Sequence, residues 1–292
     1  MKPAPFAYHA PESVDQAIEL LGEAAADAKL LAGGQSLVPA MNFRILQPSV
    51  LIDLNRIAAL DYIEPSDDGG LRLGAMTRQS AVERSALVAE RVPLLHQAMP
   101  LIAHPQIRNR GTIGGSLAHA DPAAELPVAA VAADASFVIR QNGSERTVPA
   151  DEFFQGMFTT ALGPQDLLVE IRWPGSPPRS GWAFQEVARR SGDYAMAGVA
   201  VRLTVNEAGE CQQARLVYLN VGDGPTTAPQ AAEMLVGQRH SSELVAEAAD
   251  KAAADEIFPF GNLHASPEYQ RHLARVLTVR ALNAAWGQAA AI

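Results

Sequence analysis

The sequence contains a single cysteine, Cys211, among 292 residues. One thiol cannot form an intrachain disulfide, and a cysteine-ligated zinc or iron–sulfur site needs several thiols. We therefore predict no metal on this chain. Basic residues are also scarce: 23 lysines and arginines stand against 32 aspartates and glutamates, which gives a net charge of -9. Because such a surface repels nucleic-acid and lipid phosphates, we expect no nucleic-acid partner and only local binding of phosphate.

Long hydrophobic runs are missing as well. The uncharged stretch 92–107 is interrupted by proline and histidine and is too short to span a membrane. Prolines at positions 3, 5 and 11 leave the first residues without the apolar segment of a signal peptide. We predict a cytoplasmic protein with no membrane span.

The common nucleotide-binding motifs are absent, and two glycine pairs stand in their place. Neither G-x-G-x-x-G nor G-x-x-x-x-G-K-[ST] occurs, but K-L-L-A-G-G-Q-S lies at 29–36 and R-G-T-I-G-G-S at 110–116. Adjacent glycines allow positive φ angles and close backbone approach, and successive N–H groups can bind an anion. One such pair alone is more typical of a tight turn. Two of them, with Gln35, Ser36, Thr112 and Ser116 as neutral donors, favour a diphosphate-bearing ligand.

The pattern of apolar residues predicts an α+β protein of three units. A helix at 13–23 with a Ser13–Gln16 capping box, strands near 29–32 and 50–54 and a helix at 37–44 suggest a small α/β unit, residues 1–58. A mixed unit follows at 59–175, with helices at 77–90, 93–103 and 122–133 and a hairpin turn at Asn142-Gly143.

The third unit is predicted at residues 176–292, after the proline-rich linker 173–178. Apolar residues alternate over 199–205, which is typical of a half-buried strand. Helical patterns at 228–236, 242–256 and 267–286 complete a three-stranded antiparallel sheet followed by three helices.

Four segments closely resemble one protein family. They are A-G-G-Q-S-L-V-P-A-M-N-F-R at 32–44, L-I-D-L-N-R-I at 51–57, I-R-N-R-G-T-I-G-G-S-L-A-H-A-D-P-A-A-E at 107–125 and R-R-S-G-D-Y-A at 189–195. The family is the FAD-binding medium subunit of molybdenum hydroxylases, of the carbon monoxide dehydrogenase and xanthine dehydrogenase type. The resemblance implies a two-part FAD-binding region of the vanillyl-alcohol-oxidase (PCMH) type, then a domain with a small antiparallel sheet and a three-helix bundle.

The resemblance also implies roles for individual residues. The first loop would wrap the FAD diphosphate with backbone N–H groups, and the second would be a further clasp toward the diphosphate and ribityl chain. Glu125 would accept from an FAD hydroxyl, and Asp121 would add a polar contact. Tyr194 and Leu162 would lie near the flavin ring, and Ile102 occupies a position where relatives place an aromatic residue. The two loops comprise Leu31, Ala32, Gly33, Gly34, Gln35, Ser36 and Leu37, and Thr112, Ile113, Gly114, Gly115 and Ser116.

Other polar residues are expected to be structural. Asp53 is predicted to cap a turn, and Arg108 to belong to the scaffold. His104 and His119 are more typical of structural histidines than of a covalent flavin link. Some relatives carry a lysine near Gln185 or Glu186, and this sequence does not.

No group of serine, cysteine and histidine suggests a catalytic nucleophile, so the flavin would carry the redox chemistry. The resemblance implies a subunit that takes electrons from [2Fe–2S] clusters on a small partner subunit and passes them through FAD to an external acceptor. NAD, a quinone, a cytochrome and oxygen all remain open. The substrate would react at the molybdenum cofactor of a large partner subunit, in a dimer of heterotrimers. The alternative is a stand-alone FAD-dependent oxidoreductase with its own substrate pocket.

Overall fold

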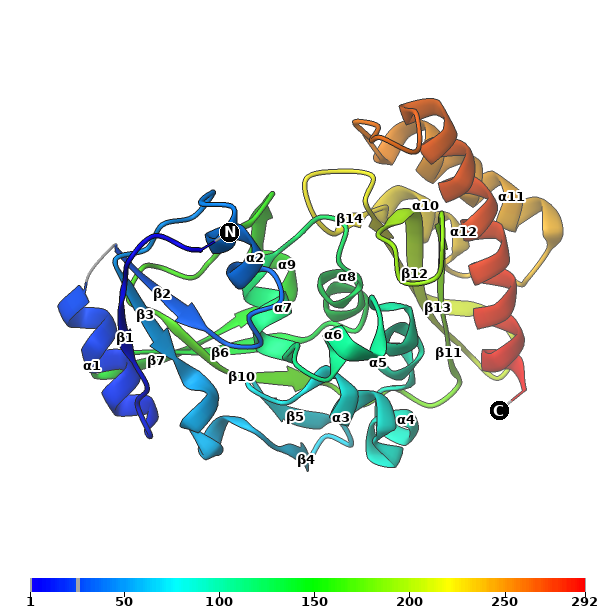
Figure 1. The fold of residues 1–292 in the computed structure, drawn as a ribbon. Coiled ribbons are helices and arrows are strands. Elements are labelled where there is room, and N and C mark those ends of the chain that lie inside the picture. The colour runs from blue at the N-terminus through cyan, green and yellow to red at the C-terminus, as the bar shows by residue number, and fades with distance from the viewer. Residues whose placement is uncertain (1, 25–26, 292) are drawn as a thin grey trace.

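The computed structural model describes residues 2–24 and 27–291, which form three successive sheets with their helices (Figure 1). The first sheet is parallel, in the order β1 (Ala7–His9), β3 (Val50–Asp53), β2 (Ala28–Leu31). Helix α1 (Val14–Ala24) packs against β3, and α2 (Leu37–Asn42) lies in the crossover from β2 to β3. The capping residues are as predicted: Ser13 Oγ accepts from Gln16 N–H, and the Gln16 side chain accepts from Glu12 N–H.

The second sheet has five antiparallel strands and carries most of the helices. Its order is β4 (Ile63–Pro65), β5 (Leu71–Gly74), β10 (Leu167–Trp173), β6 (Ser136–Gln141), β7 (Ser144–Pro149). The predicted hairpin between β6 and β7 is confirmed, with Gly143 at φ +73°. The remaining elements are α3 (Gln79–Arg84), α4 (Ala86–Arg91), α5 (Pro93–Ala98), α6 (Pro105–Arg108), α7 (Ile113–His119), α8 (Glu125–Ala132), α9 (Ala150–Phe153), and the short hairpin of β8 (Phe154–Gly156) and β9 (Thr159–Thr160).

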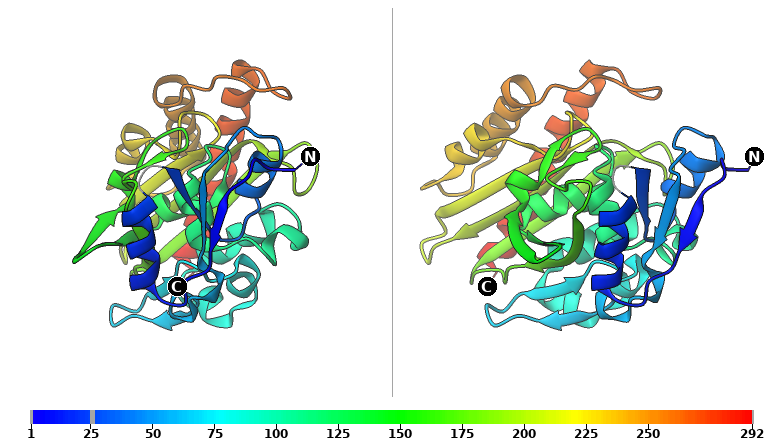
Figure 2. Two further views of the ribbon diagram at one scale, coloured as in Figure 1. Left: turned by 60° about the vertical axis from the view of Figure 1, so that its left-hand side comes forward. Right: turned by 90° about the vertical axis from the view of Figure 1, so that its left-hand side faces the viewer.

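The third sheet is antiparallel, in the order β11 (Ser180–Ala188), β12 (Ala195–Val205), β13 (Cys211–Leu219), β14 (Thr226–Thr227). Three helices follow: α10 (Pro229–Leu235), α11 (Ser242–Lys251), which continues as a π-helical turn to Glu256, and α12 (Pro267–Ala290). Helix α12 packs on β11 and β12, where Gly181 permits close approach: a Cβ there would lie 1.7 Å from the Ala285 carbonyl oxygen. The turned views place the N-terminal unit in front and these helices behind (Figure 2).

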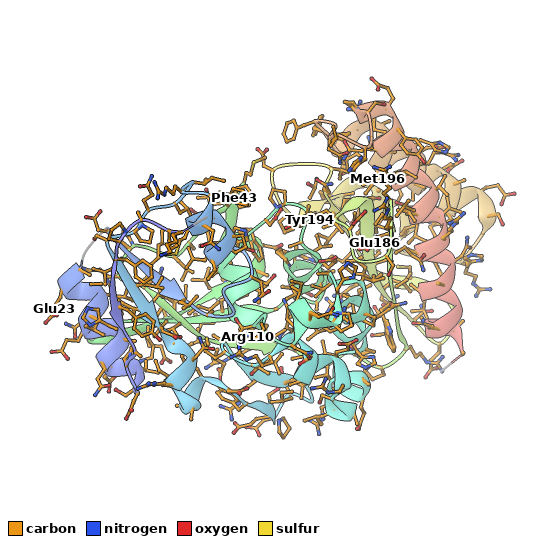
Figure 3. All side chains as sticks on the ribbon, in the orientation of Figure 1. Glu23, Phe43, Arg110, Glu186, Tyr194 and Met196 are labelled. Atoms are coloured by element: carbon orange, nitrogen blue, oxygen red, sulfur yellow. The ribbon has the colours of Figure 1, made fainter. Side chains whose placement is uncertain are left out.

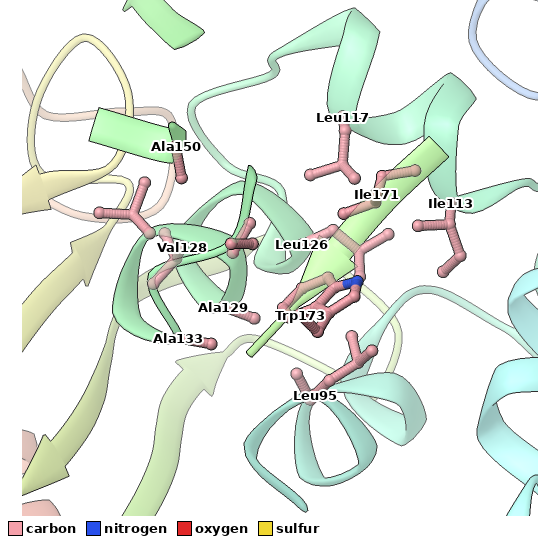
Figure 4. Close-up of a cluster of buried hydrophobic side chains, with 14 of the residues drawn as sticks. Leu95, Ile113, Leu117, Leu126, Val128, Ala129, Ala133, Ala150, Ile171 and Trp173 are labelled. Carbon is pink, nitrogen blue, oxygen red and sulfur yellow. The ribbon is translucent and has the colours of Figure 1, made fainter. Parts of the chain in front are cut away.

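One hydrophobic core joins the second and third sheets. Every residue of α8 is buried, because α5, α7 and α9 pack against it and β12 and β13 of the third sheet cover it as well. Trp173 of β10 lies in this cluster with Leu95 of α5 and Leu126 of α8 (Figure 4). Phe184 of β11 joins the cluster from the third sheet. The start of α8 is therefore fixed relative to the C-terminal sheet.

The structure confirms the α+β class and corrects several details. The third sheet has four strands where three were predicted, and the sequence analysis located neither β11 nor β14. The helix predicted at 77–90 is two helices separated at Ser85, whose backbone is extended (φ −78°, ψ 116°) while its hydroxyl accepts from Val88 N–H. Strand β12 is buried on both faces for much of its length, since Val199 and Ala200 are both fully buried. The helix predicted from 122 begins at Glu125.

Among residues 2–24 and 27–291, no helix is long and apolar enough to cross a membrane.

Candidate functional site

The first glycine loop, residues 31–37, connects β2 to α2 and offers a run of free donors. Five consecutive N–H groups, from Gly33 to Leu37, have no hydrogen-bond acceptor among the residues that the structure describes. Gly34 has φ +72°, a conformation that favours glycine. Ser36 begins α2 without capping it, so its hydroxyl also remains available. This arrangement of successive N–H groups can bind an anion.

The second glycine loop, residues 110–116, leads into α7 and differs from the first. The N–H groups of Ile113 and Gly114 donate to the carbonyls of Thr77 and Ala75, at 3.0 and 2.8 Å. That of Gly115 donates to the Thr112 hydroxyl at 3.1 Å. The expectation that both loops present free backbone donors therefore holds only for the first.

The second loop can still donate hydrogen bonds through its side-chain hydroxyl groups. Thr112 Oγ1 accepts from the backbone and keeps its own hydrogen to donate, and Ser116 Oγ makes no hydrogen bond to another described residue. Gly114 serves packing, because a Cβ there would lie 2.5 Å from the side chain of Ala75.

The two glycine loops touch each other. A Cβ on Gly33 would lie 2.5 Å from the Arg110 carbonyl oxygen and 2.7 Å from Gly111 Cα. A Cβ on Gly115 would lie 3.1 Å from that of Ala32. Segments about 80 positions apart in the chain thus form one site, and only glycine fits where they meet.

Asn55 and Arg78, which the sequence analysis did not single out, tie the two loops together. Asn55 Nδ2 donates to the Ala32 carbonyl at 2.9 Å. Arg78 Nη2 donates to Asn55 Oδ1 at 2.6 Å, and Arg78 Nη1 donates to the Arg110 carbonyl. Asp53 caps the turn before Asn55 by accepting from its N–H, as predicted.

Two carboxyl groups, one buried and one partly buried, lie between the second and third sheets. Glu125, the first residue of α8, is only 6% exposed, and burial raises its pKa to about 7, with a further contribution from Asp121. Glu186 on β11 has a buried carboxyl oxygen that finds no hydrogen-bond partner in the described part of the chain. Burial and the charge of Glu125 raise the pKa of Glu186 to about 8. At neutral pH, Glu186 therefore keeps its proton, whereas Glu125 is only partly protonated.

Tyr194 combines a free side chain with an anchored backbone. Tyr194 is 66% exposed as a residue, whereas its hydroxyl group is partly desolvated, and this desolvation together with the charge of Asp121 raises its pKa. On the N-terminal side, the turn at Gly192 rests on the His104 ring, which a Cβ would approach to 2.4 Å. On the C-terminal side, the carbonyls of Ala195 and Met196 accept from Asn220 Nδ2 and Gln270 Nε2, at 2.6 and 2.9 Å. Figure 3 shows Tyr194, Glu186 and Met196 together at this end of the C-terminal sheet.

The remaining predicted residues have structural contacts of their own. Ile102 is 8% exposed and belongs to the main core, against which half-buried Leu162 also packs. Asp121 accepts from Ala123 N–H at 2.9 Å in the turn before α8. Arg108 is scaffold, as predicted: it forms a two-nitrogen pair with Glu83, both bonds at 2.8 Å.

A separate groove of about 790 Å³ lies between α9 and the C-terminal sheet. Apart from Glu233, its charged side chains pair with one another, Arg202 and Arg215 with Asp134, and Arg215 also with Asp151. We assign it no ligand.

Comparison with known proteins identifies the family. Residues 4–176 match the family described as "FAD binding domain in molybdopterin dehydrogenase", and residues 182–285 match the "CO dehydrogenase flavoprotein C-terminal domain". The chain belongs to the FAD-binding medium subunits of the molybdenum hydroxylases. This medium subunit is thus a flavoprotein component of an oxidoreductase, and its FAD-binding domain comes before its C-terminal flavoprotein domain.

Individual relatives agree over the whole length of this medium subunit. It is 41% identical to the carbon monoxide dehydrogenase medium chain of Hydrogenophaga pseudoflava, covering 99% of this chain and 100% of that one. It is 42% identical to subunit alpha of the 6-hydroxypseudooxynicotine dehydrogenase complex of Paenarthrobacter nicotinovorans, covering 97% and 95%. The solved structure of the Hydrogenophaga pseudoflava carbon monoxide dehydrogenase lacking the Mo-pyranopterin moiety matches with a TM-score of 0.95, at 42% identity and 99% coverage of both chains.

Proposed function

We propose that the two glycine loops hold the diphosphate of FAD between them. The observation that carries this proposal is the run of five free N–H groups in the first loop, placed against a second loop by contacts that only glycine allows. A diphosphate needs many donors and little bulk, and side chains at Gly33 or Gly115 would push the two loops out of this arrangement. The residues of the first loop are Leu31, Ala32, Gly33, Gly34, Gln35, Ser36 and Leu37.

The second loop would contribute shape and hydroxyl groups. In this proposal Thr112 and Ser116 donate to the diphosphate and ribityl chain, and Ile113, Gly114 and Gly115 form the wall. Glu125 accepts from an FAD hydroxyl. Around the ring would lie Tyr194, Leu162, Ile102 and Asp121, of which Tyr194 has the most accessible side chain.

We further propose that this chain is the electron-transfer subunit of a heterotrimeric molybdenum hydroxylase, with a large molybdenum-cofactor subunit and a small [2Fe–2S] subunit. FAD can accept electrons singly and release them in pairs, which suits a junction between such clusters and an external acceptor. This chain's residues would bind and orient the cofactor and control access to it. In support, two relatives are named medium chains of carbon monoxide dehydrogenase and one is named a complex subunit.

The acceptor, whether NAD, quinone, cytochrome or oxygen, stays a prediction, as do the dimer of heterotrimers and the cytoplasmic location. We also propose domain boundaries near residues 58 and 175. In support, no strand of the three large sheets runs across either position.

Native purification tests the proposed function. The tagged chain should co-isolate with a large subunit containing molybdenum and a small subunit containing iron and sulfide, and the complex should contain one FAD for each copy of this chain. If the chain alone bound FAD and oxidised an organic substrate without partners, the stand-alone oxidoreductase would be the better description.

A further inference from the structure

The link formed by Asn55 and Arg78 does more than join the two glycine loops, because it sets the direction of a peptide group. In a trans peptide the C=O and the next N–H point in opposite directions. Asn55 holds the Ala32 carbonyl at 2.9 Å, which turns the N–H of Gly33 away from Asn55. The Gln35 side chain holds the next carbonyl, that of Gly33, at 3.0 Å. The side chains of Asn55 and Gln35 therefore determine the orientation of the N–H groups of Gly33 and Gly34.

Arg78 and Asp53 together fix Asn55 in this task, because Arg78 donates to Asn55 Oδ1 and Asp53 Oδ1 accepts from Asn55 Nδ2 at 2.5 Å. An Asn side chain can rotate or exchange the positions of its O and N atoms, but the donor at 2.6 Å on Oδ1 leaves Nδ2 facing the Ala32 carbonyl. The same guanidinium donates through its other nitrogen to the Arg110 carbonyl, the group nearest to Gly33. The planar guanidinium group of arginine can donate to both acceptors at once through two nitrogens. The ammonium group of lysine has a single nitrogen, which cannot reach both.

We propose that Arg78, acting through Asn55, is a positioning residue that aims the N–H groups of the first loop at the diphosphate. This inference rests on the proposed binding of FAD. In this role Arg78 acts by donating two hydrogen bonds through separate nitrogens. Its positive charge alone would not suffice.

Two substitutions of Arg78 test the proposal in the purified full-length chain. Arg78→Met removes the donors and the charge, and Arg78→Lys keeps the charge but loses the fork. Arg91→Met is the matched control, since Arg91 also donates to a backbone carbonyl in the same region of the chain, that of Gly70 at 3.4 Å. Each protein is titrated with FAD and with riboflavin, which lacks the diphosphate, and its thermal unfolding is recorded.

We expect both Arg78 variants to bind FAD roughly 10- to 100-fold more weakly than the wild type, because misdirected N–H groups lose charge-assisted hydrogen bonds. Riboflavin affinity should change by less than about twofold, and Arg91→Met should bind both ligands normally. Asn55→Ala should reproduce the Arg78→Met result.

Three outcomes would overturn the proposal. Wild-type FAD affinity in Arg78→Met would show that the link is dispensable. Full recovery in Arg78→Lys would show that charge alone acts. Equal losses for FAD and riboflavin, with a lower unfolding temperature, would show a general structural role. Failure of the wild-type chain itself to bind FAD would contradict the proposed function instead, which keeps the two failures distinct.

Discussion

Replacing Gly33 by alanine perturbs the contact between the two glycine loops with a single methyl group. Gly33 has no positive φ, so alanine can adopt its backbone conformation and the effect is steric alone. The new Cβ would lie 2.5 Å from the Arg110 carbonyl oxygen, and both neighbours within 3 Å are backbone atoms that no rotamer change can move.

The expected magnitude follows from that distance. Restoring an ordinary contact requires the loops to separate by roughly 0.8 Å, and such overpacking costs about 1–3 kcal/mol of stability. If the shift weakens two hydrogen bonds to the diphosphate, each contributing about 1.5–3 kcal/mol, the Kd for FAD rises about 100- to 10,000-fold.

Flavin fluorescence quenching on titration measures the Kd, and circular dichroism checks the fold. Gly22→Ala is the control: among residues 2–24 and 27–291 nothing lies within 4 Å of its Cβ, and within α1 alanine should stabilise the helix by about 0.5–1 kcal/mol. Its FAD affinity should be unchanged. A folded Gly33→Ala chain that binds FAD as tightly as the wild type would refute the reasoning.

Three further changes test other parts of the site. Glu186→Gln should stabilise the chain at high pH. The pKa of Glu186 is raised from 4.5 to about 8, so the folded state keeps a proton that the unfolded state has already released. The stability of the wild-type chain therefore falls as the pH rises between those two values, whereas that of the variant does not. Thermal unfolding at about pH 6 and about pH 9 should show a gain of roughly 1–3 kcal/mol for the variant, mainly at the higher pH, and an equal gain at both would contradict it. Arg108→Met should cost about 1–3 kcal/mol in urea unfolding, because it removes the pair with partly exposed Glu83 and takes a donor from the Ile102 and Ala103 carbonyls, and a loss below about 0.5 kcal/mol would contradict it. Gly115→Val should abolish FAD retention with little loss of fold, because a Cβ at that position meets Thr112 Oγ1 at 2.7 Å, and full flavin occupancy would count against the cradle.

The parts of the site that the sequence predicted are those with local signals. The Gly33-Gly34 pair lies between an apolar strand and a helix, and its φ requirement and free amides are properties of a few adjacent residues. The same holds for the Asn142-Gly143 hairpin and for the cap at Asp53. The sequence singled out the two glycine loops, although their contact depends on tertiary structure.

What the sequence did not predict depends on partners distant in the chain. In the second loop, the N–H groups of Ile113 and Gly114 donate to the carbonyls of Thr77 and Ala75. No local sequence pattern indicates these hydrogen bonds. Asn55 and Arg78 resemble ordinary surface residues until folding brings Ala32 and Arg110 beside them. Strand β11 was missed because both of its faces are largely covered, so the polar and apolar residues of 180–188 do not alternate.

The central claim is that the five free N–H groups of the first loop bind the diphosphate of FAD. Residue-level hydrogen exchange of the full chain, with and without saturating FAD, tests it most directly. The account predicts fast exchange at Gly33 to Leu37 without FAD and strong protection of these amides when FAD is bound, while Ile113 to Gly115 are protected in both states. Unchanged exchange at Gly33 to Leu37 in a chain that has bound FAD would contradict it.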